Sequence, residues 1–441
     1  MAHIMKRAIV AAAFGLISPW IANAQPAAIA LTLDDAIARG LANSHRLAEA
    51  EARGEAAAAT TKQRRAAQLP VISAQAGYTR TNHVNPFGIP VPGRGIALVY
   101  PDVPDNYRTR LDVQWPIYTA GRLDALERAA RAEAAAAGDD LAAARADLRL
   151  EITRAYWAYV TSIESLRVVE ESVTRVDAHL RDVRNQFTAG LVPPNEVSSV
   201  EAQESRQRML VVQAHTMQDV AEAELGRLIG ADPGMPITPV ATATAAPSSG
   251  SAAALLEEAR AQRAERAALV KRVAAAEERR RAATAGSKPT VAIAGGVDYA
   301  RPNARIFPRT DEWRESWDAG AAVTWALFDG GRAKAELAEA SALKRAAEER
   351  LAEFDAALAV EVRQRASELE SSRAAIAAAD EAVKSAGEAR RVVEDRFKAG
   401  VATSTDVLDA HVALLQAQLD RTQAIANAHL TEARLVRAVG R

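Results

Sequence analysis

Two aspartates at the start of the last predicted helix have a spacing that could do chemistry. Asp406 and Asp409 lie three residues apart, so their carboxylates share one face of that helix. Taken alone, acidic groups at this position stabilise a helix N-terminus through its dipole and by capping free backbone N–H groups. This structural role is the simpler interpretation of the pair.

The other residue types that catalyse reactions or bind metals show no such pattern. The chain has no cysteine, which excludes disulfides, thiolate metal sites, cysteine nucleophiles and a lipid-bearing N-terminal cysteine. It has no Gly-Lys-Ser/Thr phosphate loop and no Gly-x-Ser-x-Gly elbow. Six histidines without ligand spacing are expected on the surface or in grooves: His45, His83, His179, His215, His411 and His429. The sequence therefore predicts no enzyme, no metal site and no cofactor.

The composition favours long, closely packed helices over globular domains. Of 441 residues, 103 are alanine and only 5% are aromatic. Small side chains let helix backbones approach closely, and alanine has the highest helix propensity. The 55 Lys and Arg residues balance 56 Asp and Glu residues, so no nucleic-acid partner is indicated.

The N-terminus has the features of a secretory signal. Lys6 and Arg7 precede an apolar run over residues 8–17, and small residues follow at Ala22 and Ala24. We expect residues 1–24 to be a signal peptide that is cut before Gln25. No later apolar run reaches the roughly 18 residues that a membrane-spanning helix needs.

The rest of the chain is an internal duplication. A constant offset of 210 residues relates Trp115 to Trp325, Gly121 to Gly331 and many later positions. Before Trp115 the first copy carries nine extra residues, because Pro70 corresponds to Pro289. We assign the first repeat to residues 25–230, a Pro- and Ser-rich equatorial linker to 231–250, and the second repeat to 251–441.

Each repeat reads as a helix, two strands, a very long helix, a tight turn and a further helix. The segments 123–187 and 333–397 contain no proline and one glycine each. If continuous, each would be roughly 98 Å long. Late in the first segment, a 3,4 spacing of apolar residues from Leu166 to Phe187 predicts a coiled-coil seam, with the following helix as partner.

Four alternating segments are expected to be strands, approximately at 71–80, 108–118, 290–300 and 316–328. Each has the length of a strand that crosses a bilayer at a steep tilt, although soluble hairpins packed on helices would show the same pattern. Open strand edges cannot face lipid, so a membrane location requires several chains to pool their strands. The Pro-rich stretches 86–104 and 302–308 then become extracellular loops.

Duplicated motifs carry a resemblance to the TolC-type outer-membrane efflux proteins along the whole mature chain. They are the corner Trp115-Pro-Ile-Tyr-Thr-Ala-Gly121-Arg122 with its copy 325–332, and the turn motif Phe187-Thr-Ala-Gly190-Leu191. The second copy of the turn, Phe397-Lys-Ala-Gly400-Val401, is followed by Thr405-Asp-Val-Leu-Asp-Ala410. The chain departs from the family at Ser44, where proline is usual.

The resemblance implies a mainly α fold with a β-barrel part. Long antiparallel helical hairpins would form a periplasmic α-barrel, and each chain of a homotrimer would give four strands to a twelve-stranded barrel in outer-membrane lipid. The implied function is the exit duct of a tripartite efflux pump. Its implied partners are a periplasmic adaptor (membrane fusion) protein and an inner-membrane transporter of the RND or ABC type.

The resemblance also implies roles for particular residues. Asp406 and Asp409 match aspartate rings that close the periplasmic end of the channel, so six carboxylates would surround one axis and favour cations. In some relatives the residue two after the motif glycine makes a charged latch, and here that residue is the uncharged Ala402. Gly121 and Gly331 mark the strand-to-helix corners. The hairpin tips would contact the adaptor, although their glycines also suit helix ends: Ala189, Gly190, Leu191, Ala399, Gly400 and Val401.

Two other functions stay open from the sequence. The same architecture serves as the outer-membrane duct of a type I protein secretion system. A periplasmic coiled-coil adaptor or structural protein is the alternative from another class, although it should carry soluble β-domains that are not visible here. We expect an outer-membrane protein that extends into the periplasm and is anchored without lipidation.

Overall fold

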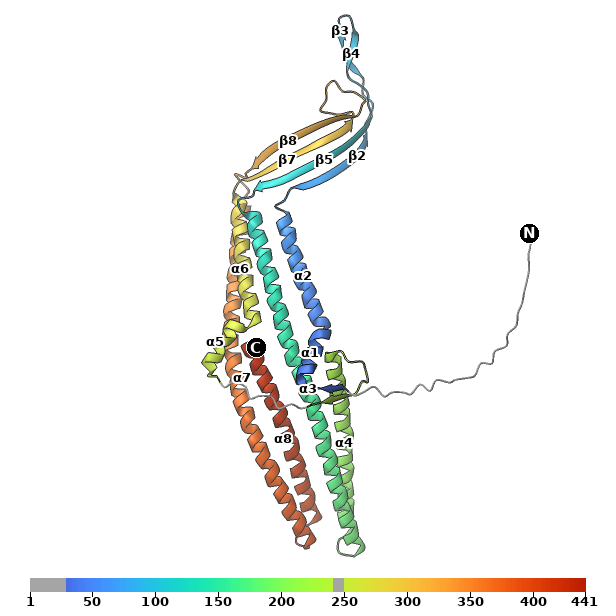
Figure 1. The fold of residues 1–441 in the computed structure, drawn as a ribbon, viewed down its shortest axis with the longest axis vertical. Helices are drawn as coiled ribbons and strands as arrows, with labels where there is room; N and C mark the ends of the chain where they lie inside the picture. Colours follow the sequence, from blue (N-terminus) through green and yellow to red (C-terminus); the bar gives the residue numbers. More distant parts are fainter. Residues whose placement is uncertain (1–28, 241–249) are drawn as a thin grey trace, which may run out of the picture.

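A computed structural model describes residues 29–240 and 250–441 of the chain. The predicted signal peptide, 1–24, lies outside the described residues, and so do residues 241–249 of the predicted linker, 231–250. The molecule is elongated: a β-sheet lies at one end, and long helices run from it to two hairpin tips at the other (Figure 1). The described helices include none that is both long and apolar enough to cross a membrane.

The elements follow the 210-residue repeat. The first copy contains α1 (Leu33–Asn43), α2 (His45–Ala66), β2 (Val71–Arg80), β5 (Asp105–Tyr118), α3 (Arg122–Thr188) and α4 (Pro194–Ile229). The second contains α5 (Ala252–Gln262), α6 (Ala264–Thr284), a short 3-10 turn (Ala285–Ser287), β7 (Thr290–Arg301), β8 (Arg314–Thr324), α7 (Arg332–Lys398) and α8 (Ser404–Val439). Both α3 and α7 have 67 residues, and both α4 and α8 have 36.

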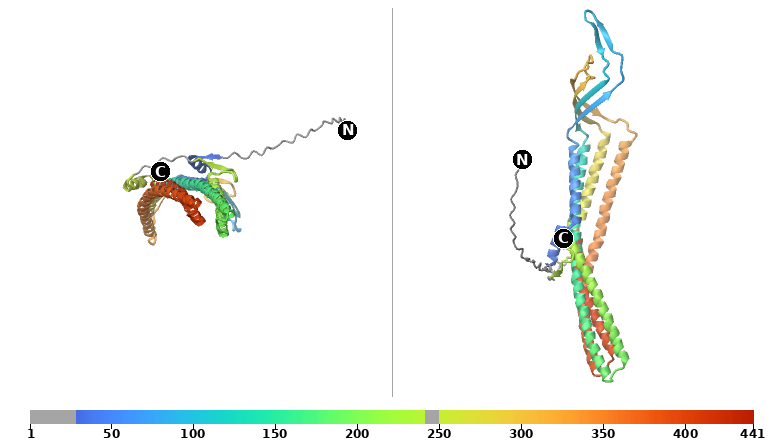
Figure 2. Two further views of the ribbon diagram at one scale, coloured as in Figure 1. Left: turned by 90° about the horizontal axis from the view of Figure 1, so that it is seen from below. Right: turned by 90° about the vertical axis from the view of Figure 1, so that its right-hand side faces the viewer.

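The helices form a curved wall, not a closed bundle. Seen along the long axis, the helices trace an arc, with α1 and α5 on its convex side (Figure 2). Near the sheet, α3 packs between α2 and α6 through small side chains: Ala125, Ala129 and Ala136 are at most 2% exposed. Alanine at these positions lets the neighbouring backbones approach closely. The alanine-rich composition therefore reflects the wall.

At the middle of the molecule, a larger core joins the helices to two short strands. β1 (Ile29–Leu31) pairs in parallel with β6 (Ile237–Pro239). The hydroxyl of Tyr159 donates to the carbonyl of Ile237 at 2.8 Å, and Tyr156 is fully buried beside it. Burial raises the pKa of Tyr159 to about 12. These contacts hold the start of the linker, at β6, against α3.

Four strands form one antiparallel sheet with the order β2-β5-β7-β8. The register aligns apolar residues on one face: Leu111 lies opposite Val297, which lies opposite Trp317. All three are exposed, and Trp317 is 76% exposed. The alternate positions carry polar residues, including Arg110, which pairs with Asp298 across the strands. The sheet therefore has one exposed apolar face and one polar face.

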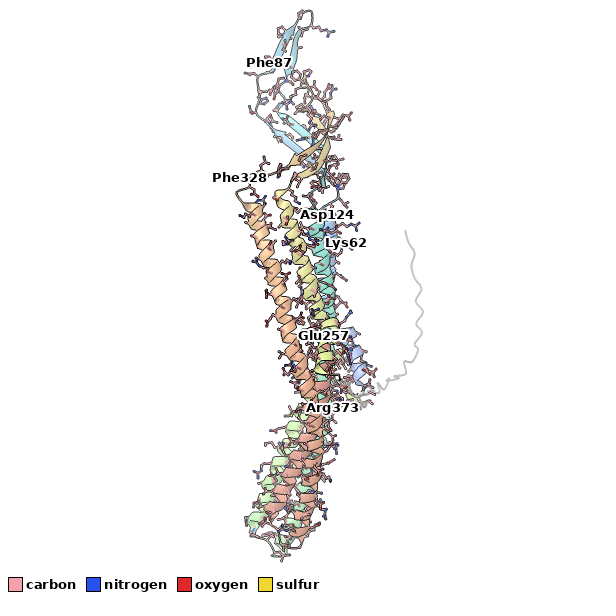
Figure 3. The ribbon with its side chains drawn as sticks, turned by 90° about the vertical axis from the view of Figure 1, so that its left-hand side faces the viewer. Lys62, Phe87, Asp124, Glu257, Phe328 and Arg373 are labelled. Atoms are coloured by element: carbon pink, nitrogen blue, oxygen red, sulfur yellow. The ribbon has the colours of Figure 1, made fainter. Side chains whose placement is uncertain are left out.

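The strand region differs from expectation mainly in the fourth strand and in the stretch 86–104, and the second strand also begins earlier, at Asp105. The fourth strand ends at Thr324, not at 328, because the chain turns toward α7: the Asp329 carboxylate accepts the backbone N–H of Gly331 at 2.9 Å and of Ala333 at 2.8 Å. The stretch 86–104 is not only a loop. It contains the hairpin of β3 (Phe87–Val91) and β4 (Gly95–Tyr100), whose apolar residues pair across a turn. Figure 3 shows Phe87 on this hairpin and Phe328 at the opposite end of the sheet.

The predicted seam on α3 is buried over most of its length. Val176, Leu180 and Val183 are at most 4% exposed. They pack not only toward α4 but also with Val407 and Leu408 of α8. Phe187, at the end of the seam, is 44% exposed. The two helical hairpins are therefore joined to each other close to their tips.

Candidate functional site

Asp406 has a capping role in the structure. Its Oδ2 accepts hydrogen bonds from the backbone N–H and the hydroxyl of Thr403, both at 2.8 Å. The Asp406 N–H in turn donates to the Thr403 hydroxyl at 3.2 Å, which completes a capping box at the start of α8. These bonds hold the pKa of Asp406 below its usual value, so the carboxylate stays ionised at neutral pH.

Asp409 lies on the same exposed side of α8, one turn further along. Both carboxylate residues are exposed, whereas Val407 and Leu408 between them are buried against α3 and α4. Within the described residues, no hydrogen bond or ion pair engages the Asp409 carboxylate. The structure thus places two ionisable groups on an open face, and only Asp406 has a local structural partner.

The two hairpin tips have the same backbone geometry. Gly190 and Gly400 have φ of 75° and 74°, a conformation that glycine adopts without strain. The N–H of Leu191 reaches the Gln186 carbonyl at 2.8 Å, and the N–H of Val401 reaches that of Arg396 at 2.9 Å. Ala189 and Ala399 are the last residues before these glycines and cap α3 and α7.

Both tips expose an apolar side chain. Leu191 is 74% exposed and Val401 is 63% exposed. The capping role of the glycines does not require an apolar residue at this point. The tips therefore combine a fixed turn with a small apolar projection that a partner could contact.

Two histidines are buried between the hairpins, contrary to the expectation that they lie on the surface or in grooves. His179 is 6% exposed, and its Nε2 lies 2.8 Å from the Ser404 hydroxyl. His411 is 3% exposed, and its Nε2 lies 2.8 Å from Glu394. Burial lowers the pKa of His179 to about 4 and also lowers that of His411.

The sequence held a signal for this burial. His179 falls within the apolar seam between Val176 and Leu180, and His411 lies three residues after Leu408 on α8. A polar residue at such a position needs a buried partner. Spacing along the sequence does not show which residues become such partners.

The strand-to-helix corners repeat closely. Gly121 and Gly331 precede α3 and α7 with φ of 80° and 89°. At the first corner, the indole N–H of Trp115 donates to the Gln68 carbonyl at 3.0 Å. Each glycine takes the left-handed backbone conformation directly before the first helical residue, Arg122 or Arg332.

Comparison with known families finds one family model that matches both repeats of the chain. The model of the outer membrane efflux protein family matches residues 36–231 and 255–441. The chain belongs to the outer membrane efflux protein family. Its fold class, expected from the sequence as long helical hairpins with a strand region in two repeats, is confirmed.

Solved structures show the same fold at low sequence identity. VceC, an outer membrane protein of Vibrio cholerae, is 22% identical with a TM-score of 0.77, covering 92% of this chain and 96% of that one. The CmeC outer membrane channel of Campylobacter jejuni is 16% identical with a TM-score of 0.79, covering 92% and 85%. The MtrE channel of Neisseria gonorrhoeae, in an open state, is 19% identical with a TM-score of 0.74, covering 92% and 88%. The chain matches none of the curated proteins with which it was compared.

Membership of this efflux family defines the general class of function. The family consists of channel proteins of the outer membrane and not of enzymes. In the described part of the chain, no group of three or more histidine, aspartate or glutamate side chains is placed to hold a metal ion. The carboxylates and the hairpin tips therefore belong to a member of a family of outer-membrane channel proteins.

Proposed function

We propose that this chain forms a homotrimeric exit duct of a tripartite efflux pump. Each of three chains would give four strands to a barrel in the outer membrane and two helical hairpins to a periplasmic tunnel. A periplasmic adaptor and an inner-membrane transporter would deliver substrates to it. Residues 1–24 would direct export, and the barrel alone, without lipidation, would anchor the duct.

The observation that carries this proposal is the two-faced sheet with open edges. Its apolar face exposes Leu111, Val297 and Trp317, which suit contact with lipid. The edge strands β2 and β8 each pair with only one other strand in the described part of the chain. Unpaired backbone groups are not tolerated in lipid, so further copies must supply the missing partners.

The curved helical wall supports the same arrangement. The helices form an arc, and the sheet follows them at one end of the molecule (Figure 2). One chain of a tunnel wall built from several copies would have this shape. Asp406 and Asp409 would then form the gate at the far end, where three copies bring six carboxylates around one axis. Such a ring would favour cations and penalise anions. The exposed tips at Leu191 and Val401 would dock the helical hairpin of the adaptor.

A fractionation experiment tests the proposed function. Antibody detection should place the protein in the outer-membrane fraction as an oligomer that separates into single chains only on heating. Recovery in the soluble periplasmic fraction would contradict the duct and favour an adaptor or structural role. A deletion strain that loses drug or metal resistance supports the efflux role, whereas loss of a secreted protein alone would favour type I secretion.

A further inference from the structure

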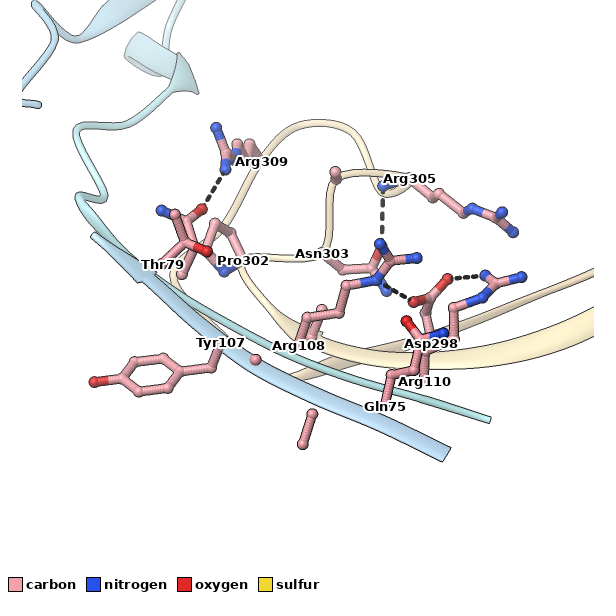
Figure 4. A pocket seen from close by; sticks show the side chains of 15 residues that line it. Gln75, Thr79, Tyr107, Arg108, Arg110, Asp298, Pro302, Asn303, Arg305 and Arg309 are labelled. Carbon is pink, nitrogen blue, oxygen red and sulfur yellow. Dashed lines mark hydrogen bonds and ion pairs between the residues drawn. The ribbon is translucent and has the colours of Figure 1, made fainter. Parts of the chain in front are cut away.

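A polar cavity of about 410 Å³ lies against the sheet at the end away from the helices. It is bounded by β2, β5 and β7 and by the loop 302–309, which folds back over the polar face (Figure 4). Asn303 fixes this loop, because its Nδ2 donates to the Arg314 carbonyl and to the Ser316 hydroxyl, both at 3.0 Å. Asn303 is only 4% exposed. Hydrogen bonds within one chain therefore define the shape of the cavity.

Cations outnumber anions around the cavity. Four arginines but one acidic residue line it: Arg108, Arg110, Arg305, Arg309 and Asp298. Asp298 is already engaged, because it pairs with Arg108 at 2.6 Å and also with Arg110. Two neighbouring aspartates are engaged as well, since Asp112 pairs with Arg110 at 2.6 Å and Asp318 pairs with Arg305 at 2.7 Å. No lining carboxylate is left over.

Among the residues that the structure describes, Arg309 has only uncharged partners. Its two terminal nitrogens donate to the Tyr100 hydroxyl at 2.7 Å and to the Asn106 side-chain oxygen at 2.8 Å. Its Nε is buried and makes no hydrogen bond within the described residues. A guanidinium prefers a carboxylate or a phosphate, which it can bind with two parallel hydrogen bonds. The guanidinium also lies over the Tyr100 ring, 5.2 Å from its centre, but within the described residues it has no acidic partner, so its charge favours an anion.

The floor of the cavity leaves room for such a ligand. Gly77 of β2 lies opposite Arg108 of β5, and no atom lies within 4 Å of the place where a Cβ would stand at Gly77. The side chain of Arg108 is 61% exposed at the rim. A small anion above Gly77 would meet charged donors without displacing any protein atom.

We propose that this cavity binds an anionic solute through a carboxylate or phosphate group, with Arg309 and Arg108 as its main donors. The inference rests on the proposed duct in one respect: in that duct, the apolar face meets lipid and the polar face lines the lumen. The ligand then comes from the transported solutes, and the site biases the outer end of the channel toward anions. Asp406 and Asp409, at the periplasmic end of the proposed duct, would instead favour cations.

Binding of inorganic phosphate to the purified protein in a neutral detergent tests this site by isothermal titration calorimetry. The wild-type chain should bind phosphate saturably, and Arg309→Gln should weaken binding by about tenfold because one charge-assisted donor set is lost. Arg309→Lys, which keeps the charge but not the planar fork, should weaken it less. Gly77→Val should also weaken it, because this substitution fills the cavity without changing any charge.

Arg301→Gln is the matched control. Arg301 pairs with Asp311 at 2.9 Å and does not line the cavity, so its loss removes the same charge from the same end of the sheet. Phosphate binding that is absent, or that falls equally in Arg301→Gln, would overturn the site. All the residues belong to one chain, so binding by single chains would support the site even if the trimer of the proposed function failed.

A second arm separates the solute from a lipid headgroup. The titration is repeated in nanodiscs of phosphatidylcholine, with or without phosphatidylglycerol. Unchanged phosphate affinity supports a solute site in the lumen. Competition by phosphatidylglycerol would assign the cavity to anionic lipid and overturn the solute proposal.

Discussion

The imidazole Nε2 of His179 on α3 lies 2.8 Å from the hydroxyl of Ser404, the first residue of α8. This contact joins the two helical hairpins two residues before Asp406. The ring of His179 also packs at 5.1 Å from that of Phe397, at the end of α7. The proposed gate is therefore built on a buried contact between hairpins, and its stability should respond to the charge of one histidine.

Acidification should loosen this contact. The pKa of His179 falls to about 4 when it is buried, from an ordinary value of 6.5, so the unfolded chain binds the proton more readily between these values. The stability that neutral His179 contributes is therefore complete above about pH 6.5 and is lost as the pH falls toward 4. At pH 5 the loss should be of the order of 2 kcal/mol per chain. Hydrogen exchange of α3 and α8 near their tips measures it.

The environment of His179 contains groups of both signs. His411 opposes a positive charge on His179, whereas Asp182 and Glu394 favour it. Arg390 and Arg175 oppose a positive charge on the neighbouring His411. His179→Asn, which stays neutral, should therefore flatten the pH dependence between pH 7.5 and 5. His83→Asn, at an exposed histidine beyond the sheet, is the control. Equal acid sensitivity in wild type and His179→Asn would contradict this role.

The carboxylates of α8 should set the ion selectivity of the channel. The double variant Asp406→Ala/Asp409→Ala should lose cation selectivity and block by divalent cations in planar bilayers, because the ring of negative charge is gone. Asp409→Asn alone should reduce selectivity without loss of thermal stability, since Asp409 does not cap the helix.

A second capping box provides the control for the double variant Asp406→Ala/Asp409→Ala. Asp35 accepts from Thr32 at the start of α1 as Asp406 does from Thr403. Asp35→Ala therefore removes the same kind of cap far from the tips. Selectivity that is unchanged in the double variant, or altered as much by Asp35→Ala, would argue against the gate.

The corner glycines should be essential for local stability. Gly121→Ala should destabilise the chain by about 1–2 kcal/mol, because an L-residue is strained at its φ of 80°. Gly138→Ala should instead stabilise it by about 0.5–1 kcal/mol, since Gly138 lies inside α3 with nothing near its missing Cβ. Urea denaturation of the two variants compares them, and effects of the same sign would contradict the assignment.

The tips should be the parts of the chain that touch the adaptor. The chain has no cysteine, so a thiol introduced by Leu191→Cys or Val401→Cys is unique. A short thiol-reactive crosslinker should join either site to the cognate adaptor in cells. Leu327→Cys, 80% exposed at the sheet end, should give no such product. Crosslinks from Leu327→Cys alone would contradict docking at the tips.

The duplication made much of the fold predictable. The offset of 210 residues recurs in the bounds of α3 and α7 and of α4 and α8. The nine extra residues before Trp115 also have a structural counterpart. The indole of Trp115 bonds to the Gln68 carbonyl and that of Trp325 to the Ser287 carbonyl at 3.1 Å, so the bonded partners differ by 219 positions.

Contacts between distant elements were less predictable. The pairing of His179 with Ser404 joins residues 225 positions apart, and apolar periodicity does not specify which polar groups meet. The hairpin at 87–100 was missed because glycine and proline interrupt its short strands, which favours the prediction of a loop. The proposed preference of the outer end of the channel for anions depends on the loop 302–309, which folds back over the sheet. No local sequence pattern indicates that this loop folds back.

The central claim is that several copies of this chain pool their strands to close a barrel. Native mass spectrometry of the protein extracted from outer membranes tests it most directly. The account predicts an assembly with three times the mass of one mature chain, without a stable single chain. A monomer or a dimer as the main species would contradict it, because four or eight strands would leave the proposed twelve-stranded barrel incomplete.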